Sequence, residues 1–208
     1  MSNASARLVL GVLIALPAGA HAQTPRVANA AAQIAAAILA APEDRRAGTK
    51  VYGYDEGRRL VTLREGTNDT ICLADDPARE GFEVDCYHVS LEPFMARGRE
   101  LAAQGVEGPA RTETRFREAE QGTLKMPDKP AMLYIVTGTS FNAATGEVAG
   151  LYRRSVIYIP YATTESTGLS TSPSTTDPWI MAPGTPGAHI MITPPRPGGD
   201  HLFQRINE

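Results

Sequence analysis

A few histidines, two cysteines and scattered carboxylates are the residues whose types and spacing suit chemistry. His88 follows Cys86 by two positions, and His189 stands in a later apolar segment. In an extended strand His88 shares a face with Cys86, and Asp85 points the other way. A carboxylate from Asp85 or Glu92 would complete, with the two histidines, a metal site or a general acid–base pair. The spacing does not require this site, because a histidine beside an apolar strand is more often a hydrogen-bonded structural residue.

The short motifs of common enzyme classes are missing from the sequence. It has no G-x-S-x-G elbow, no P-loop, no G-x-G-x-x-G and neither H-E-x-x-H nor C-x-x-C. A catalytic group recognised by geometry alone would still escape such a search. The sequence therefore favours a non-catalytic ligand-binding or structural module without a cofactor. The alternative is a metal-dependent or hydrolytic enzyme that uses His88 and His189.

Cys72 and Cys86 are the only cysteines, and an acidic turn containing Asp75, Asp76 and Gly81 separates them. We interpret them as a disulfide that joins two short extended segments across this turn. Closing a loop of this length would stabilise the fold by about 3 kcal/mol. The alternative is a reactive Cys86 thiolate near His88, but only the disulfide accounts for both cysteines at once.

The N-terminus has the pattern of a secretory signal peptide. Arg7 precedes the apolar run Leu8–Leu16, and the small-residue site Ala20–Ala22 follows it. The run is shorter than the roughly 20 apolar residues that span a bilayer. A buried N-terminal helix is the alternative interpretation. With cleavage after residue 22, the mature protein would be exported to the periplasm or the extracellular medium, without a transmembrane segment.

Composition points to one ordinary folded domain. The chain has 208 residues, of which 42% are hydrophobic and 21% are charged. The formal net charge of −3 and the absence of a basic cluster argue against nucleic acid as a partner. A small molecule or a component of the cell envelope is the partner that an exported protein of this kind would meet.

The pattern of apolar residues predicts an α+β fold with an antiparallel sheet of about five or six short strands. One main amphipathic helix, over residues 91–104, packs on a face of this sheet, and Ser90 is expected to cap it. A second, more charged helix is expected over residues 112–121. The continuous apolar run 131–136 predicts a central strand, and residues 155–159 its partner.

The remaining segments are assigned by their turns and composition. Residues 50–73 read as antiparallel hairpins, and residues 188–192 as the last strand. Alanine-rich residues 27–41 favour a helix that dangles from the domain. The expected organisation is a leader (1–22), an N-terminal helix and linker (23–49), one domain (50–195) and a tail (196–208).

A long Ser/Thr-rich loop, residues 163–178, precedes the only tryptophan, Trp179. Asp177 and the hydroxyl groups could supply hydrogen bonds to a ligand, and Tyr161 and Trp179 could supply flat apolar area. The alternative is a solvated loop that Trp179 anchors to the core. Long loops are either functional or mobile, and the sequence does not separate the two.

Several segments together resemble a group of small exported bacterial proteins of unknown function. The shared features are residues 51–54, the run Leu60–Asn68, the segment Cys72–Pro77 and the closing segment Pro186–Ile192, which contains His-Ile-Met-Ile. The resemblance implies a bacterial, extracytoplasmic setting. It transfers no activity, cofactor or catalytic residue.

Overall fold

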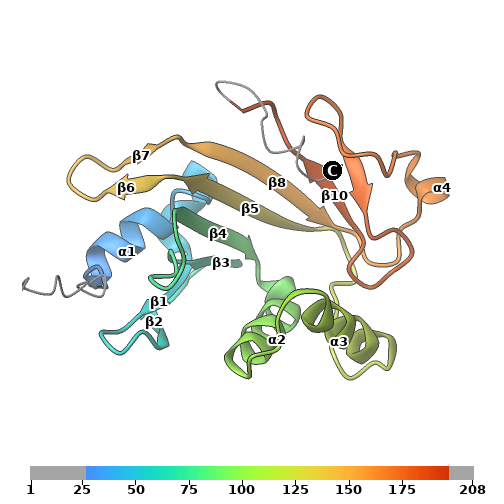
Figure 1. Ribbon diagram of the computed structural model, residues 1–208, viewed down its shortest axis with the longest axis horizontal. Coiled ribbons are helices and arrows are strands. Elements are labelled where there is room, and N and C mark those ends of the chain that lie inside the picture. The colour runs from blue at the N-terminus through green and yellow to red at the C-terminus, as the bar shows by residue number, and fades with distance from the viewer. Residues whose placement is uncertain (1–26, 197–208) are drawn as a thin grey trace, which may run out of the picture.

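One large, mostly antiparallel sheet organises the fold (Figure 1). The computed structural model describes residues 27–196, so the expected leader and most of the tail lie outside the described residues. Eight strands follow the order β2-β1-β3-β4-β5-β8-β10-β9, and β6 and β7 form a separate two-stranded hairpin. The strands are β1 (Lys50–Tyr54), β2 (Leu60–Arg64), β3 (Thr70–Leu73), β4 (Phe82–His88), β5 (Ala131–Gly138), β6 (Ser140–Asn142), β7 (Glu147–Ala149), β8 (Tyr152–Tyr158), β9 (Trp179–Met181) and β10 (His189–Ile192).

The α+β class and the antiparallel pairing of β5 with β8 are confirmed, but two details of the expected sheet are wrong. The sheet has eight strands rather than five or six, and the short edge strand β9 lies outside every segment expected to be a strand. Residues 50–73 are also not a simple meander. After the β1–β2 hairpin the chain crosses to the other side of β1, where β3 pairs with β1 in parallel.

The helices lie in two places (Figure 1). Helix α1 lies near the β6–β7 hairpin, whereas α2 and α3 lie together below the other end of the sheet. Helix α2 confirms the main helix expected over residues 91–104, and α3 confirms the second one with a start four residues earlier. The helical segments are α1 (Ala30–Ala37), η1 (Glu43–Gly48), η2 (Val89–Leu91), α2 (Glu92–Ala103), α3 (Gly108–Glu120) and α4 (Thr164–Thr167).

The two faces of the sheet can be followed across the strands, because directly opposed residues share a face. We call face A the side that holds Cys72, Cys86 and Tyr134, which are opposed in register on β3, β4 and β5. Face B is the other side. Its central row consists of Ile71, Tyr87, Leu133, Val156, Met191 and Trp179.

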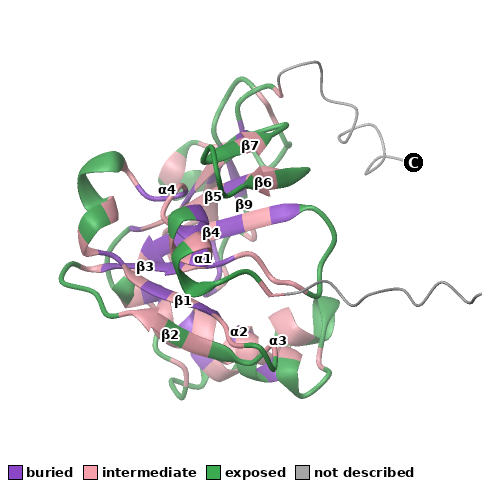
Figure 2. Cartoon of the chain, turned by 90° about the vertical axis from the view of Figure 1, so that its left-hand side faces the viewer, coloured by how far each residue is buried: buried purple, intermediate pink, exposed green. Residues whose placement is uncertain are grey.

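Helix α1 covers part of face A, so the expectation that it dangles is wrong. Ala36 and Ala37 are buried and belong to the same core cluster as Cys72 and Cys86. Figure 2 shows α1 lying across β4, whose residues are buried or half-buried. Alanine lacks a bulky side chain, so the helix can approach the sheet closely, and its weak apolar periodicity conceals this packing.

Helices α2 and α3 pack against face B. Leu91 is fully buried beside Tyr87 and Ala131, and Met95 packs against the same cluster. Phe94 of α2 contacts Phe116 of α3, with ring centroids 6.4 Å apart. Within residues 27–196, no helix has both the length and the apolar character needed to cross a membrane.

Candidate functional site

The only two cysteines form a disulfide in the middle of the sheet. Cys72 of β3 and Cys86 of β4 are directly opposed in register, and both are fully buried on face A. The bridge confirms the interpretation of the two cysteines as a staple and excludes a reactive Cys86 thiolate in this state. It also fixes the end of β4, where His88 lies.

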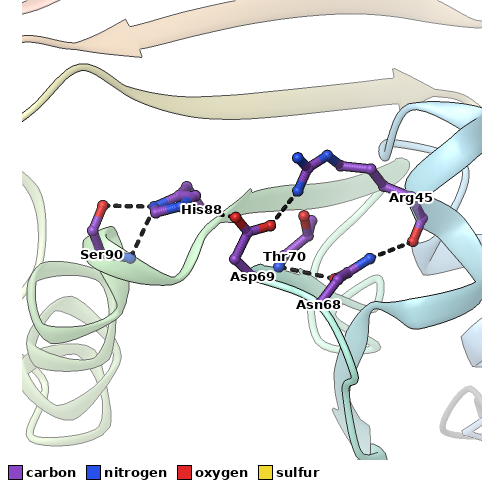
Figure 3. A network of polar contacts seen from close by, with 6 residues as sticks. All are labelled: Arg45, Asn68, Asp69, Thr70, His88 and Ser90. Atoms are coloured by element: carbon purple, nitrogen blue, oxygen red, sulfur yellow. Dashed lines mark hydrogen bonds and ion pairs between the residues drawn. The ribbon is translucent and has the colours of Figure 1, made fainter.

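His88 belongs to a polar network that joins three segments (Figure 3). Its Nε2 lies 3.3 Å from Oδ2 of Asp69, which stands just before β3. The other carboxylate oxygen of Asp69 pairs with Arg45 of η1. On its far side, His88 Nδ1 lies 2.8 Å from the Ser90 hydroxyl oxygen.

The hydrogen bonds fix the tautomer of a neutral His88. The Ser90 backbone N–H donates to His88 Nδ1 at 3.2 Å, so this nitrogen is an acceptor. The ring proton of the neutral imidazole is therefore on Nε2 and points to Asp69. The Ser90 hydroxyl can then donate to Nδ1. His88 is thus the N-cap of η2. The expectation that Ser90 caps the helix over residues 91–104 is wrong, because Ser90 lies within η2 and α2 has no side-chain cap.

Asp69 is the acidic partner of both Arg45 and His88 in this network. Burial raises the pKa of the Asp69 carboxyl, but the Arg45 guanidinium and His88 outweigh this effect, so the pKa lies below its usual value. The side chains of Asp69 and Arg45 are each 44% exposed, and His88 is 42% exposed. Ion pairs this exposed stabilise proteins by less than about 1 kcal/mol. The network is therefore a surface arrangement rather than a buried catalytic centre.

His189 does not join this network. It is two residues from Met191 on β10 and so lies on face B, whereas His88 is two residues from Cys86 and lies on face A. Three strand spacings, about 14 Å at the usual 4.8 Å per strand, also separate β4 from β10. The two histidines therefore do not form one site in this fold.

The two carboxylates expected to complete that site also lie elsewhere. Glu92 pairs with Arg99 at 2.7 Å and accepts a hydrogen bond from the Tyr87 hydroxyl. Asp85 lies on face B between Leu73 and Ile135. Among residues 27–196, no group of three or more His, Cys, Asp and Glu side chains is placed to hold a metal ion.

Tyr161, Asp177 and Trp179, which were expected to form a ligand platform, differ in burial: Trp179 lies in the core, and the other two are exposed. Trp179 is only 5% exposed and belongs to a core cluster with Val156 and Met191 on face B. Its indole therefore anchors the Ser/Thr-rich loop. Tyr161 is 51% exposed, and Asp177 is exposed and accepts a hydrogen bond from the neighbouring Thr176 hydroxyl.

A groove with a volume of about 390 Å³ lies between α1, the turn after β3 and the start of the β6–β7 hairpin. Its floor is apolar: Phe82 and Phe141 stack with ring centroids 5.6 Å apart, and Ala32 and Ala36 face them from α1. The polar residues at its rim are Asp75, Asp76, Arg79, Thr139 and Ser140.

The rim of the groove is shaped by short-range hydrogen bonds. Asp75 accepts a hydrogen bond from the Glu83 backbone N–H, and Asp76 accepts one from the Ala78 N–H. Burial raises the pKa of the Asp75 carboxyl, and the nearby Asp76 carboxylate adds to this effect. Each aspartate thus uses one oxygen to hold the turn.

Sequence reasoning missed this groove because its lining comes from three separate segments. Residues 27–36, 75–82 and 139–143 meet only after the sheet has formed. The acidic turn between the cysteines was the one available signal. No family model, no curated protein and no solved structure matches this chain.

Proposed function

We propose that this chain is an exported, non-catalytic binding module that holds a small ligand in the groove between α1 and the β6–β7 hairpin. The observation behind this proposal is the groove itself. Its volume of about 390 Å³ falls within the roughly 300–1,000 Å³ of ligand sites, and it combines an apolar floor with a few polar groups at the rim. The disulfide supports an oxidising compartment such as the periplasm or the extracellular medium.

The lining defines the kind of ligand that would fit. The stacked rings of Phe82 and Phe141 offer a flat apolar surface, on which an aromatic or alicyclic body can pack. The carboxylates of Asp75 and Asp76 are hydrogen-bond acceptors at one side. We therefore propose a small molecule with an apolar body and at least one hydrogen-bond donor.

Filling the groove should abolish binding. The neutral dye N-phenyl-1-naphthylamine has a flat apolar body and one N–H donor, and its fluorescence rises in apolar surroundings. We expect saturable binding to the native protein and at least about tenfold weaker binding to Ala32→Phe, because the added ring would occupy the space between α1 and the two phenylalanine rings. A fluorescence titration measures both affinities.

Ala35→Phe is the matched control for this experiment. Ala35 lies on the exposed side of the same helix and does not line the groove. It adds the same ring without filling the site, so its affinity should equal that of the native protein. Non-saturable binding to the native protein, or equal weakening in both variants, would contradict the proposal.

The His88 network supports a second candidate function, a hydrolase that acts by acyl transfer. Ser90, His88 and Asp69 lie in the nucleophile, base and orienting positions, with contacts of 2.8 Å and 3.3 Å. A shallow depression that includes Asp69 adjoins them. It ranks second because the Ser90 N–H donates to His88 and the Val89 N–H to the Asp69 carbonyl. These two backbone donors are therefore not available to stabilise an oxyanion.

Hydrolysis of p-nitrophenyl acetate separates the two functions. If the network is catalytic, Ser90→Ala should reduce the rate at least about a hundredfold, because it removes the nucleophile. Ser172→Ala, in an exposed loop, is the matched control and should keep the native rate. The binding module predicts instead that Ser90→Ala and Ser172→Ala both hydrolyse the ester as slowly as the native protein.

A further inference from the structure

A second group of side chains, on face B, is independent of the groove and of the His88 network. Arg115 of α3 lies over the ring of Phe94, with its guanidinium carbon 4.1 Å from the ring centroid. Phe94 contacts Tyr158 of β8 edge-on at 5.9 Å, and Tyr158 packs on His189 of β10 at 5.0 Å. We call Arg115, Phe94, Tyr158 and His189 the Arg115 cluster.

Arg115 has no acidic partner among residues 27–196. Its Nε is buried without a hydrogen bond, and its one hydrogen bond is a long contact of 3.4 Å from Nη1 to the Phe94 carbonyl. The neighbouring Arg97 and Arg99, on α2, pair with glutamates at 2.7 Å. Burial lowers the pKa of Arg115, as expected for a partly desolvated cation that has no acidic partner among the described residues. A desolvated cation of this kind favours a bound anion.

The other polar groups of the cluster are the His189 imidazole and the Tyr158 hydroxyl. His189 Nδ1 lies 2.6 Å from the Gly187 carbonyl and so donates to it, which makes Nε2 the unprotonated nitrogen. Burial lowers the pKa of His189 and raises that of the Tyr158 hydroxyl, so both groups are neutral near pH 7. Arg115 and the Tyr158 hydroxyl are close enough to influence each other's pKa, so Tyr158 adds a hydroxyl donor to the cluster.

The position of the guanidinium is held by the packing of the two helices. A Cβ at Gly98 of α2 would lie 2.9 Å from Arg115 Nη1, so a larger residue there would displace the side chain. A Cβ at Gly187, two residues before His189, would lie 2.3 Å from the ring of Phe116, the residue after Arg115 in α3. The cluster is therefore closely packed, and Arg115 has little freedom to seek a partner elsewhere in the protein.

We infer that the Arg115 cluster binds a small oxyanion, a carboxylate or a phosphate group attached to a flat apolar body. The guanidinium offers two parallel N–H groups that match the oxygens of either anion, and the Tyr158 hydroxyl is a further donor. Phe94 is buried, so the partly exposed rings of Tyr158 and His189 would contact the apolar part. This site is on the sheet face opposite α1, so it would bind its ligand independently of the groove.

Isothermal titration of the purified protein at constant ionic strength tests this inference, with inorganic phosphate, phenyl phosphate and benzoate as probes. We expect saturable binding of phenyl phosphate or benzoate, and the stronger of the two identifies the anion class. Arg115→Met should weaken binding at least about tenfold, because it removes both charge and fork geometry. Arg117→Met, on the exposed side of the same helix, removes an equal charge and should leave the affinity unchanged.

Two results would overturn the site. If none of the three probes binds saturably, Arg115 serves only to pack on Phe94. If Arg117→Met weakens binding as much as Arg115→Met, the anion is attracted by the overall positive charge of α3, and Arg115 does not form a specific site. Should Arg115→Met fail to fold, Tyr158→Phe keeps the ring and removes only the hydroxyl. It should weaken binding about threefold if the site exists, and an unchanged affinity would contradict the hydroxyl's role.

Discussion

Replacement of both Cys72 and Cys86 by alanine is expected to lower the free energy of unfolding by about 3 kcal/mol. The bridge joins two neighbouring strands that remain hydrogen-bonded without it, so the native sheet should persist. The loss arises mainly in the unfolded chain, which regains the freedom of the loop between the two cysteines. Urea unfolding followed by circular dichroism measures the difference, since the midpoint should fall while the spectrum of the folded protein is retained.

Reduction of the native protein provides an independent control for this prediction. With dithiothreitol, its unfolding midpoint should approach that of the double alanine variant, which should itself not respond to the reductant. Thiol alkylation of the unreduced native protein should label neither cysteine. Stoichiometric labelling of both cysteines, or equal stability of the native and double alanine proteins, would contradict a stabilising bridge.

Local apolar patterns predicted the elements whose burial they report directly. Helix α2 was predictable because its apolar residues recur on one side, and Leu91, Phe94 and Leu101 are indeed buried. Strands β5 and β8 were predictable because their apolar runs are long. The disulfide needed only the two cysteines and an expected oxidising compartment.

Pairing between distant strands was not available from these local patterns. Nothing within residues 50–73 indicates that β3 pairs with β1 in parallel instead of continuing a meander from β2. The separation of the two histidines has the same origin. Whether His88 and His189 share a face depends on the register of β4, β5, β8 and β10, which is set by pairings across more than 100 residues.

Burial of small residues explains why the role of α1 escaped prediction. Its alanines give almost no apolar contrast between the two sides of the helix. These alanines pack against face A of the sheet, around Cys72, Val84 and Cys86, where a helix with small side chains can approach closely. The groove depends on this contact, since Ala32 and Ala36 form one of its walls. The groove could therefore not be predicted from the sequence, because the position of α1 could not be predicted.

Asp85→Asn is expected to raise the free energy of unfolding by about 2 kcal/mol at pH 8 and to have little effect at pH 4. Asp85 lies on face B between the apolar side chains of Leu73 and Ile135, and its carboxylate has no hydrogen-bond partner among the described residues. Burial raises the pKa of its carboxyl to about 7, with a further contribution from Glu83, while Arg154 and Arg79 oppose the rise.

The sign of this pH dependence follows from the raised pKa. Between about pH 4 and pH 7 the folded state binds a proton at Asp85 that the unfolded state has already released, so stability falls as the pH rises. A shift of three pKa units corresponds to about 4 kcal/mol, which we halve because the side chain is only partly buried. Asparagine remains neutral at every pH and should remove this loss. Urea unfolding at several pH values measures both proteins.

Asp128→Asn is the matched control for the Asp85 prediction, since Asp128 is an exposed residue in the loop before β5 and loses the same charge. Its stability should follow the native pH profile. The difference between Asp85→Asn and the native protein should grow from pH 4 to pH 8 and then level off. Parallel pH profiles for the two proteins would show that Asp85 is ionised throughout this range, and that face B is more accessible to water than its packing indicates.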